Sequence, residues 1–571
     1  MNLRSQKYTI LSSILLLNTL LISTFIYFSD YWYAYIFILA SESIINSSAS
    51  ILILLHKLLT LSSSNNKNIL PKKYLYVIPC YNESEEELTN TLQSLVHQKN
   101  IDGDIRLLCI VCDGCVKGTG NNMSTDKILK KILNVQDTAD YYDYKTWDNK
   151  TNIIKSYNGK YCNLDYILFI KEKNYGKRDS LVLVRKLCYA YNNINNKKCE
   201  TSLFNDIINK FTNIFYEKID YIIGIDADTI FDTNCTKELI KGIERLPGLY
   251  GCVGYVDISP KMNPYSLWTL YQYGEYMYSQ CLKRYAQSVI THKVNCLSGC
   301  NQILKVTEET CGDEILNKFN RLPKENENIF NHIRSYASED RNHVCLMLSK
   351  YPYVKTVQNI NAKAYTIAPN NINVFLSQRR RWNLGANCND MLLTYLPGIN
   401  IFERISSFVN ILTFITSPFI LVATGYFLKI LFTDPPFLML YLSIIMIIPF
   451  IYSLLIPIII MKLSFKKTLY YYLSYGIYLI FGSIVNIITY SYALINIDTI
   501  KWGKTRSINE TSSDTSSSSS SSKDLSINSL INNFDKYLSN KKILNKNDNE
   551  QYQEDPYYYQ PMQVEIRETY V

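Results

Sequence analysis

Long apolar segments on both sides of a more polar middle region constrain this chain more than any other feature. Two of them, 8–28 and 32–60, lie near the start, and three, 405–432, 437–461 and 468–496, follow the middle region. Each is long enough to cross the hydrocarbon core of a bilayer as a helix. Buried helices of soluble proteins are usually much shorter, so we expect a multi-pass membrane protein.

Basic residues beside these segments indicate which side of the membrane each loop occupies. They are Lys72 and Lys73 after the second segment, and Lys462, Lys466 and Lys467 between the fourth and fifth. Because short cytosolic loops are enriched in lysine and arginine, we expect the middle region in the cytosol. Three later spans would place the C-terminus outside, whereas Lys501, Lys504 and Arg506 favour the inside. The conflict disappears if one of the three segments is re-entrant or interfacial, which the sequence leaves open.

The net charge of +9, from 59 basic and 50 acidic residues, bears on the partners. Such a charge suits nucleic acid, anionic lipid or a phosphorylated small molecule. Basic residues cluster in the middle region and beside apolar segments, so we expect membrane lipids and a phosphate-bearing substrate, and no nucleic acid. The 15 cysteines are scattered, and the one CxxC pair, Cys109 and Cys112, lies in an apolar run. We interpret these two as buried thiols rather than metal ligands.

The middle region alternates apolar strand-like runs with helix-like runs. The predicted strands are Tyr74–Pro79, Ile105–Cys112, Tyr166–Lys171 and Tyr221–Asp226, and the predicted helices run from Glu83 towards His97 and from Asp179 towards Ala190. Apolar strands that alternate with helices predict an α/β domain with a mostly parallel sheet covered by helices. Ligands of such sheets bind at the carboxyl ends of the strands, so the residues that end these runs are the candidates for chemistry.

Acidic residues end three of the predicted strands. Glu83 follows the first, Asp113 the second, and Asp226 and Asp228 the fourth. Alone, an aspartate after a strand caps a helix as often as it binds a ligand. Two carboxylates two residues apart can share one divalent cation, and phosphate oxygens of a substrate can then complete the coordination of that cation. We favour a metal site for Asp226 and Asp228 over a solvated turn.

Three further stretches carry residues suited to group transfer. Lys177 and Arg178 open a predicted helix and could hold a diphosphate, or form an exposed basic loop. Asp340, between Glu339 and Arg341, could remove a proton from an attacking hydroxyl, or belong to a surface ion pair. The third stretch, just before an apolar segment, could anchor anionic lipid or clamp phosphate beside an aromatic platform; it reads Gln378-Arg379-Arg380-Arg381-Trp382.

In order and spacing these stretches resemble the processive family 2 glycosyltransferases with a GT-A fold, whose hallmark is D, DxD, ED, QxxRW. In the residues within and around these motifs, the chain is similar to chitin synthases of the branch with a WGxTR-type motif. The matching stretches are PCYNESEEEL (79–88), GKRDSL (176–181), DADT (226–229), CLSGC (296–300), EDR (339–341), QRRRW (378–382) and WGKTR (502–506). The chain departs from the family at Ser298, where proline is usual, and at Asn342-His343, where Tyr-Leu is usual.

The resemblance implies a role for each matching residue. Tyr81, Glu83 and Asp113 would bind the uridine end of UDP-GlcNAc and Lys177 its diphosphate, with Glu339 and Arg341 also at the substrate. Asp226 and Asp228 would hold Mg²⁺ or Mn²⁺, and Asp340 would be the general base. The residues at the acceptor end would be Gln378, Arg381 and Trp382.

The implied enzyme is a hexosyltransferase of the plasma membrane that transfers GlcNAc with inversion to the non-reducing end of a growing β-1,4-linked chain and exports it. We expect two transmembrane helices in 1–62, a cytosolic GT-A domain in 63–400 inserted between transmembrane segments, and an interfacial helix with about three spans in 401–500. The WGKTR motif and a disordered Ser-rich tail would occupy 501–571. A homo-oligomer is compatible with the sequence.

Two other interpretations keep the architecture and change the function. The first is a hyaluronan- or cellulose-type synthase, or a transferase that adds one sugar to a lipid-linked acceptor; GKRDSL, QRRRW and WGKTR argue against it. The second is a membrane scaffold or transporter with an inactive transferase domain. The intact carboxylates Asp113, Asp226, Asp228 and Asp340 argue against the second.

Overall fold

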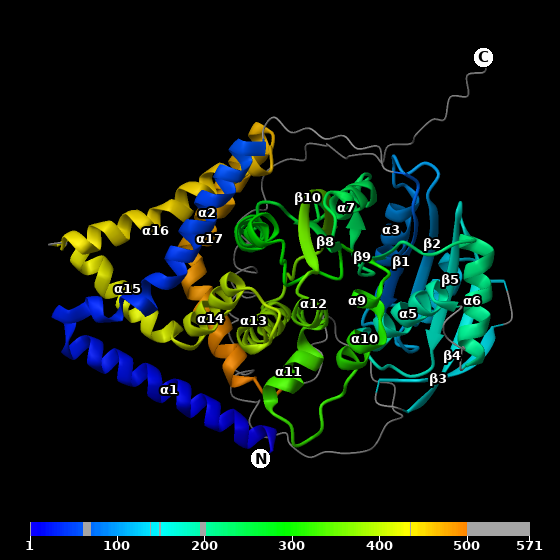
Figure 1. The fold of residues 1–571 in the computed structure, drawn as a ribbon, viewed down its shortest axis with the longest axis horizontal. Helices are drawn as coiled ribbons and strands as arrows, with labels where there is room; N and C mark the ends of the chain where they lie inside the picture. The colour runs from blue at the N-terminus through cyan, green and yellow to red at the C-terminus, as the bar shows by residue number, and fades with distance from the viewer. Residues whose placement is uncertain are drawn as a thin grey trace, which may run out of the picture. The chain divides into compact units, whose positions relative to one another are not determined.

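The computed structural model describes residues 2–60, 70–136, 139–147, 150–194, 201–433 and 436–499. Within these ranges a sheet with its covering helices lies to one side and long apolar helices lie to the other (Figure 1). The predicted WGKTR motif and the Ser-rich tail fall outside the described residues.

Four parallel strands form the centre of the sheet and confirm the predicted ones. They are β1 (Lys73–Cys80), β2 (Ile105–Cys112), β5 (Leu164–Lys171) and β6 (Tyr221–Gly224). β1 pairs with β2 and β6, and β2 pairs with β5, all in parallel. Their carboxyl ends therefore meet at one edge of the sheet, where residues 81, 113 and 226 leave it.

Outside this centre the sheet is mixed, because one further parallel pair, between the strands 249–258 and 355–366, is joined by antiparallel pairs. The described strands are ordered β3-β4-β5-β2-β1-β6-β9-β8-β10-β7. The outer ones are β3 (Asp140–Lys145), β4 (Thr151–Tyr161), β7 (Ile230–Phe231), β8 (Leu249–Ile258), β9 (Gln302–Lys305) and β10 (Lys355–Thr366). A two-residue turn joins β4 to β5, and so short a connection permits only antiparallel pairing.

Both faces of the central sheet are covered because side chains alternate along its buried strands. On β1, Tyr74, Tyr76 and Ile78 pack with helix α3 (Glu85–Val96), while Leu75 and Val77 pack with α5 (Lys177–Asn192) on the other face. Ser84 and Glu87 begin α3 with a reciprocal capping box. Because α3 follows β1 and α5 follows β5 after short loops, both helices start at the sheet edge where the parallel strands end.

The remaining helices of the middle region follow from the same apolar patterning. They are α4 (Thr125–Ile132), α6 (Ser202–Phe215), α7 (Cys235–Glu244), α8 (Leu267–Ser279), η3 (Gln280–Arg284), η4 (Gln287–Thr291), α9 (Glu308–Cys311), α10 (Asp313–Phe319), α11 (Ile329–Ala337), α12 (Glu339–Lys350) and α13 (Ile372–Tyr395). Cys109 and Cys112 are fully buried in β2, as predicted.

Among the described residues, four helices are long and apolar enough to cross a membrane: 3–27, 29–60, 437–460 and 465–495. In these spans lie α1 (Leu3–Tyr27), η1 (Ser29–Tyr35), α2 (Ile36–Thr60), α16 (Phe437–Leu455), η5 (Ile456–Ile460) and α17 (Phe465–Ile495). A fifth apolar stretch is a pair, α14 (Ile401–Ile415) and α15 (Ser417–Leu431), bent by 81° as in a broken span or a re-entrant loop.

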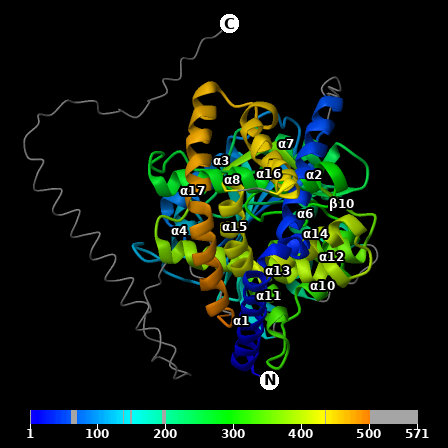
Figure 2. The ribbon, with the colours of Figure 1, turned by 90° about the vertical axis from the view of Figure 1, so that its left-hand side faces the viewer.

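Two helices of the middle region connect it to the apolar helices. α13 contacts both α14 and α17, and α8 packs along α17. Figure 2 shows α8 beside α17, with α13 close to α14. The polar residues of α13 therefore stand between the sheet edge and the membrane helices.

Candidate active site

One cavity of about 1240 Å³ collects the residues singled out from the sequence. All the predicted site residues line it: Tyr81, Glu83, Asp113, Lys177, Asp226, Asp228, Glu339, Asp340, Arg341, Gln378, Arg381 and Trp382. The cavity also reaches polar residues of the apolar helices, among them Asn46 of α2, Asn410 of α14 and Thr489 of α17. It thus runs from the sheet edge to the membrane helices.

Lys177 is the cation at the carboxylate end of the cavity. It opens α5, and its Nζ lies 2.7 Å from Asp226 Oδ1, 3.8 Å from Glu339 Oε1 and 3.9 Å from Asp340 Oδ2. Burial by itself would lower the pKa of Lys177, but these three carboxylates outweigh burial and raise it well above its usual value. The side chain therefore stays charged and joins the DxD stretch to the EDR stretch.

Two aspartates of this cluster have raised pKa values. Burial, reinforced by the charge of Asp226, raises the pKa of Asp228 to about 6. Burial also raises the pKa of Asp340 to about 6, with Glu339 and Asp226 adding to the effect and Lys177 opposing it. Carboxyls that titrate near neutrality inside a cavity are candidates for proton transfer and for metal binding.

Asp340 lies in the first turn of α12, and one of its two carboxylate oxygens is hydrogen-bonded while the other is buried without a hydrogen-bond partner among the described residues. Its Oδ2 accepts a hydrogen bond of 2.8 Å from the backbone N–H of Gly299, in the CLSGC stretch. Its buried Oδ1 has no hydrogen-bond partner among the described residues. A carboxylate that is held by one oxygen, and whose other oxygen lacks a hydrogen-bond partner beside a cavity, is placed to act as a general base.

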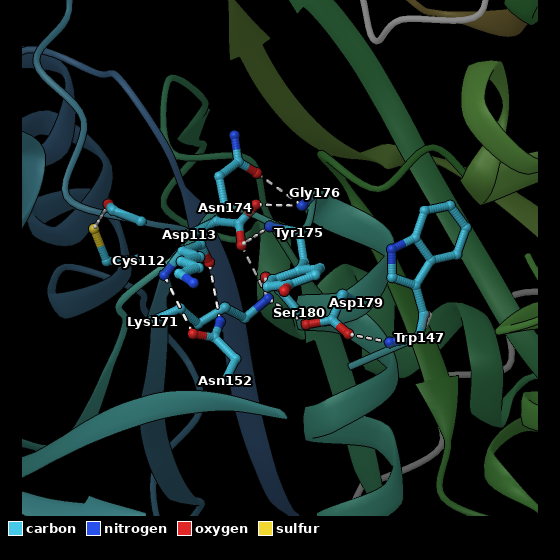
Figure 3. Close-up of polar contacts among 12 residues, drawn as sticks. Cys112, Asp113, Trp147, Asn152, Lys171, Asn174, Tyr175, Gly176, Asp179 and Ser180 are labelled. Atoms are coloured by element: carbon cyan, nitrogen blue, oxygen red, sulfur yellow. Dashed lines mark hydrogen bonds and ion pairs between the residues drawn. The ribbon is translucent and has the colours of Figure 1, made fainter. Parts of the chain in front are cut away.

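Asp113 is engaged in a network that shapes the loop before Lys177 (Figure 3). Its two carboxylate oxygens accept hydrogen bonds from the Nζ of Lys171 at 3.0 Å and from the backbone N–H groups of Tyr175 and Gly176 at 3.1 and 2.6 Å. Lys171 is fully buried and also donates to Asp179 at 2.7 Å. Asp113 thus fixes the loop, and its contact with uridine stays a prediction.

The QRRRW stretch lies within α13, where its side chains divide between two directions. Gln378, Arg381 and Trp382 line the cavity, as expected for residues at helical positions i, i+3 and i+4. Burial lowers the pKa of Arg381, and the charges of Glu339, Asp226 and Asp340 oppose that effect. Trp382 keeps 45% of its surface exposed, so a ring face is free to meet a ligand.

Arg341 ties the EDR stretch to α13. Its Nη1 lies 3.8 Å from Asp390 Oδ1, and Asp390 Oδ2 accepts a hydrogen bond of 3.1 Å from Asn410 of α14. The guanidinium thus forms a largely buried ion pair with Asp390, a partner that lies outside the EDR stretch. Whether Arg341 also touches substrate stays a prediction.

Sequence reasoning missed three residues that position the site: Lys171, Gly299 as a contact of Asp340, and Glu275 of α8, which pairs with Arg379 of α13. Lys171 carried a signal, since a lysine that ends an apolar strand must find buried partners. The other two contacts join segments far apart in sequence, and no local pattern marks them.

Gly299 leaves no room for a side chain. A Cβ there would lie 2.7 and 2.8 Å from the oxygens of Asp340 and 2.9 Å from the Nζ of Lys177. Because the ends of both side chains can shift, we expect Gly299→Ala to fold with near-normal thermal stability and to lose transferase activity about 10²-fold. Gly476→Ala, with no atom within 4 Å of the added Cβ, is the control. A fully active Gly299→Ala enzyme would contradict this geometry.

The central parallel strands, the carboxylates at their ends and the adjoining apolar helices form the arrangement that the sequence resemblance predicts for a membrane-attached glycosyltransferase with a GT-A domain. A family model described as chitin synthase matches residues 50–172 and 167–539. The chain is 34% identical to chitin synthase 8 of Gibberella zeae over 531 residues, 90% of this chain and 79% of that protein. It is 32% identical to chitin synthase 8 of Verticillium dahliae, over 74% of each. The chain belongs to the chitin synthase family.

Among solved structures, a mannosyltransferase from Pyrobaculum calidifontis in complex with GDP-Man and Mn²⁺ aligns with 77% of this chain and 99% of its own. The sequence identity is 10% and the TM-score 0.38, too low to carry an argument.

Proposed function

We propose that this protein polymerises GlcNAc from UDP-GlcNAc into a β-1,4-linked chain and passes that chain through its apolar helices. One observation carries the proposal: a candidate base, Asp340, shares a cavity with a cation, Lys177, a DxD pair and an aromatic platform, Trp382, in a chain of the chitin synthase family. The uridine and sugar would occupy the sheet edge near Tyr81 and Glu83. The acceptor end would lie against Trp382.

A divalent cation fits the DxD pair when donor phosphates supply further ligands. Among the described residues, no group of three or more His, Cys, Asp or Glu side chains is arranged to hold a metal ion. Mg²⁺ typically takes only one or two protein carboxylates and completes its coordination with waters and substrate phosphates. Asp226 and Asp228 would hold Mg²⁺ or Mn²⁺, which would neutralise charge on the departing diphosphate.

The remaining chemistry falls to side chains of this chain. Asp340 would take the proton from the attacking hydroxyl of the acceptor on Oδ1, the oxygen that has no hydrogen-bond partner among the described residues. Lys177 and Arg381, which share the field of Asp226, Glu339 and Asp340, would stabilise the negative charge that develops on UDP. A single displacement at the anomeric carbon inverts its configuration and gives a β-linkage.

Contacts at the chain's start support one membrane topology. Lys7 at the start of α1 pairs at 2.8 Å with Asp498, just after α17, and Gln6 accepts a hydrogen bond from the backbone N–H of Ile329 in the middle region. The start of α1, the end of α17 and the middle region at Ile329 would therefore lie on one side of the membrane. The basic residues Lys72 and Lys73, after α2, suggest that this side is the cytosol.

With α1, α2, α16 and α17 each crossing once, the number of crossings is even only if α14–α15 is re-entrant. This topology would place the C-terminal end in the cytosol, but it would place Lys462, Lys466 and Lys467, around the turn between α16 and α17, on the opposite side, against the expectation from their charge.

A radiolabel assay tests the proposed reaction. Membranes that contain the expressed chain should incorporate label from UDP-GlcNAc, with Mg²⁺ or Mn²⁺ present, into an insoluble product that chitinase digests. Incorporation should stop when EDTA removes the divalent cation and return when Mn²⁺ is restored. A chitinase-resistant product, or preferential incorporation from UDP-glucose, would overturn the assignment of the sugar.

A further inference from the structure

Arg379 lies beside the proposed acceptor platform but outside the cavity. The cavity is lined by Gln378, Arg381 and Trp382, and Arg379 is absent from its lining. Only 3% of the Arg379 surface is exposed. A guanidinium that is buried next to a substrate cavity without facing it must act through its neighbours, and the contacts it makes show which neighbours these are.

The Arg379 guanidinium is stacked between two aromatic rings of its own helix. Its Cζ lies 4.3 Å from the ring centroid of Phe375 and 4.3 Å from that of Trp382. Phe375, Arg379 and Trp382 occupy positions i, i+4 and i+7 of α13, which lie on one helix face. Such contact with a flat cation gives the Trp382 ring a rigid support on one side.

Hydrogen bonds fix the guanidinium in this position. Its Nε donates to Glu275 Oε1 at 3.0 Å and its Nη2 to Glu275 Oε2 at 2.5 Å, a bidentate pair, while Nη1 donates to the side-chain oxygen of Gln378. Burial would lower the pKa of Arg379, but the charge and hydrogen bonds of Glu275, together with nearby tyrosines, outweigh burial and raise it, so the guanidinium stays charged. Arg379 therefore contacts two of the cavity-lining residues at once, Trp382 and Gln378.

The carboxylate that fixes Arg379 belongs to a rigid helix. Glu275 lies in α8, whose Trp268 packs against Phe375 with ring centroids 4.5 Å apart. Tyr271 of α8 meets Tyr478 of the membrane helix α17 at 5.7 Å. The support of Trp382 is thus continuous with the helix that crosses the membrane beside the cavity.

We infer that Arg379, held by Glu275, is a positioning residue that orients Trp382 and Gln378 towards the acceptor sugar. The inference rests on the proposed role of Trp382 as acceptor platform. A purely structural ion pair would contribute to stability alone. A positioning residue would also govern whether bound donor is transferred to the acceptor or lost to water.

The test compares Arg379→Gln, Arg379→Lys, Trp382→Leu and the double variant Arg379→Gln/Trp382→Leu, each as the full-length protein in membranes. We expect Arg379→Gln to reduce polymer synthesis by about 10–100-fold, the loss that a displacement of about 1 Å can cause. The KM for UDP-GlcNAc should change by less than twofold, and more of the donor should be hydrolysed to free GlcNAc. Arg379→Lys should not restore activity, because lysine lacks the flat fork that stacks and pairs.

The double variant separates action through Trp382 from independent action. If Arg379 acts through Trp382, adding Arg379→Gln to Trp382→Leu should cause little further loss, whereas independent losses multiply. Arg321→Gln, at a surface pair with Glu327, is the matched control. It should keep the wild-type ratio of sugar transferred to polymer over sugar hydrolysed to free GlcNAc. The inference is overturned if the activity losses of the two single variants multiply in the double variant. It is also overturned if Arg379→Gln keeps the wild-type ratio of transfer to hydrolysis. A fully active Trp382→Leu enzyme overturns the platform role in the proposed function instead.

Discussion

An Asp340→Asn variant should bind UDP-GlcNAc normally and synthesise polymer about 10²–10⁴-fold more slowly, the usual contribution of a positioned general base. Asparagine nearly matches the shape of aspartate and can still accept the hydrogen bond from Gly299, so the cavity should keep its form. The loss should therefore fall on turnover and leave the KM for the donor almost unchanged. Radiolabel incorporation at saturating donor measures turnover, and a direct UDP-binding measurement reports donor affinity, so the two effects can be separated.

The pH profile provides a second, independent check on Asp340. With its pKa raised to about 6, the carboxyl is protonated as the pH falls through that value and can no longer accept a proton. Wild-type activity should therefore fall on the acid side near pH 6, and the residual activity of Asp340→Asn should lack this fall. If the variant kept the same acid limb, the pKa of about 6 at Asp228 would be its source instead. Asp165→Asn, at a surface pair with Lys160, is the control.

The centre of the fold was predictable because local patterns determine it. Apolar runs of strand length indicate β1, β2, β5 and β6, and the rule that parallel strands end at one edge of the sheet predicts that residues 81–83, 113 and 226–228 gather there. The outer strands were missed because pairs such as β8 with β9 depend on distant segments. Likewise, apolar composition does not distinguish a straight span from the bent pair α14–α15, since the two helices of the pair are together long and apolar enough to span a membrane, as the straight helices are.

In the candidate site, likewise, the residue types could be predicted from the sequence, but the contacts among them could not. Motif spacing indicated which side chains would gather, but the relations among them arise in tertiary structure. The QRRRW stretch shows the difference: three adjacent arginines look equivalent in sequence, yet a helix turns each about 100° from the last. Arg381 consequently faces the cavity, while Arg379 faces Glu275 of α8, more than a hundred residues away.

Replacing Lys177 with methionine should disable the enzyme through two separate effects. Its Nζ is the cation that Asp226, Glu339 and Asp340 share, and loss of one electrostatic partner of this kind commonly lowers turnover by about 10²–10³-fold. Because Lys177 lowers the pKa of Asp340, its removal should raise that pKa and move the acid limb of the pH profile to higher pH.

Lys177→Arg is the matched control for charge, because it keeps a cation at the start of α5. If the ammonium acts by its charge, Lys177→Arg should retain more activity than Lys177→Met and an acid limb close to that of the wild type. If instead it acts only as a bulky wall of the cavity, the two variants should lose activity alike and neither limb should move. The direction of the shift is decisive, because a protein that had merely become less stable would lose activity across the profile without moving the limb upward.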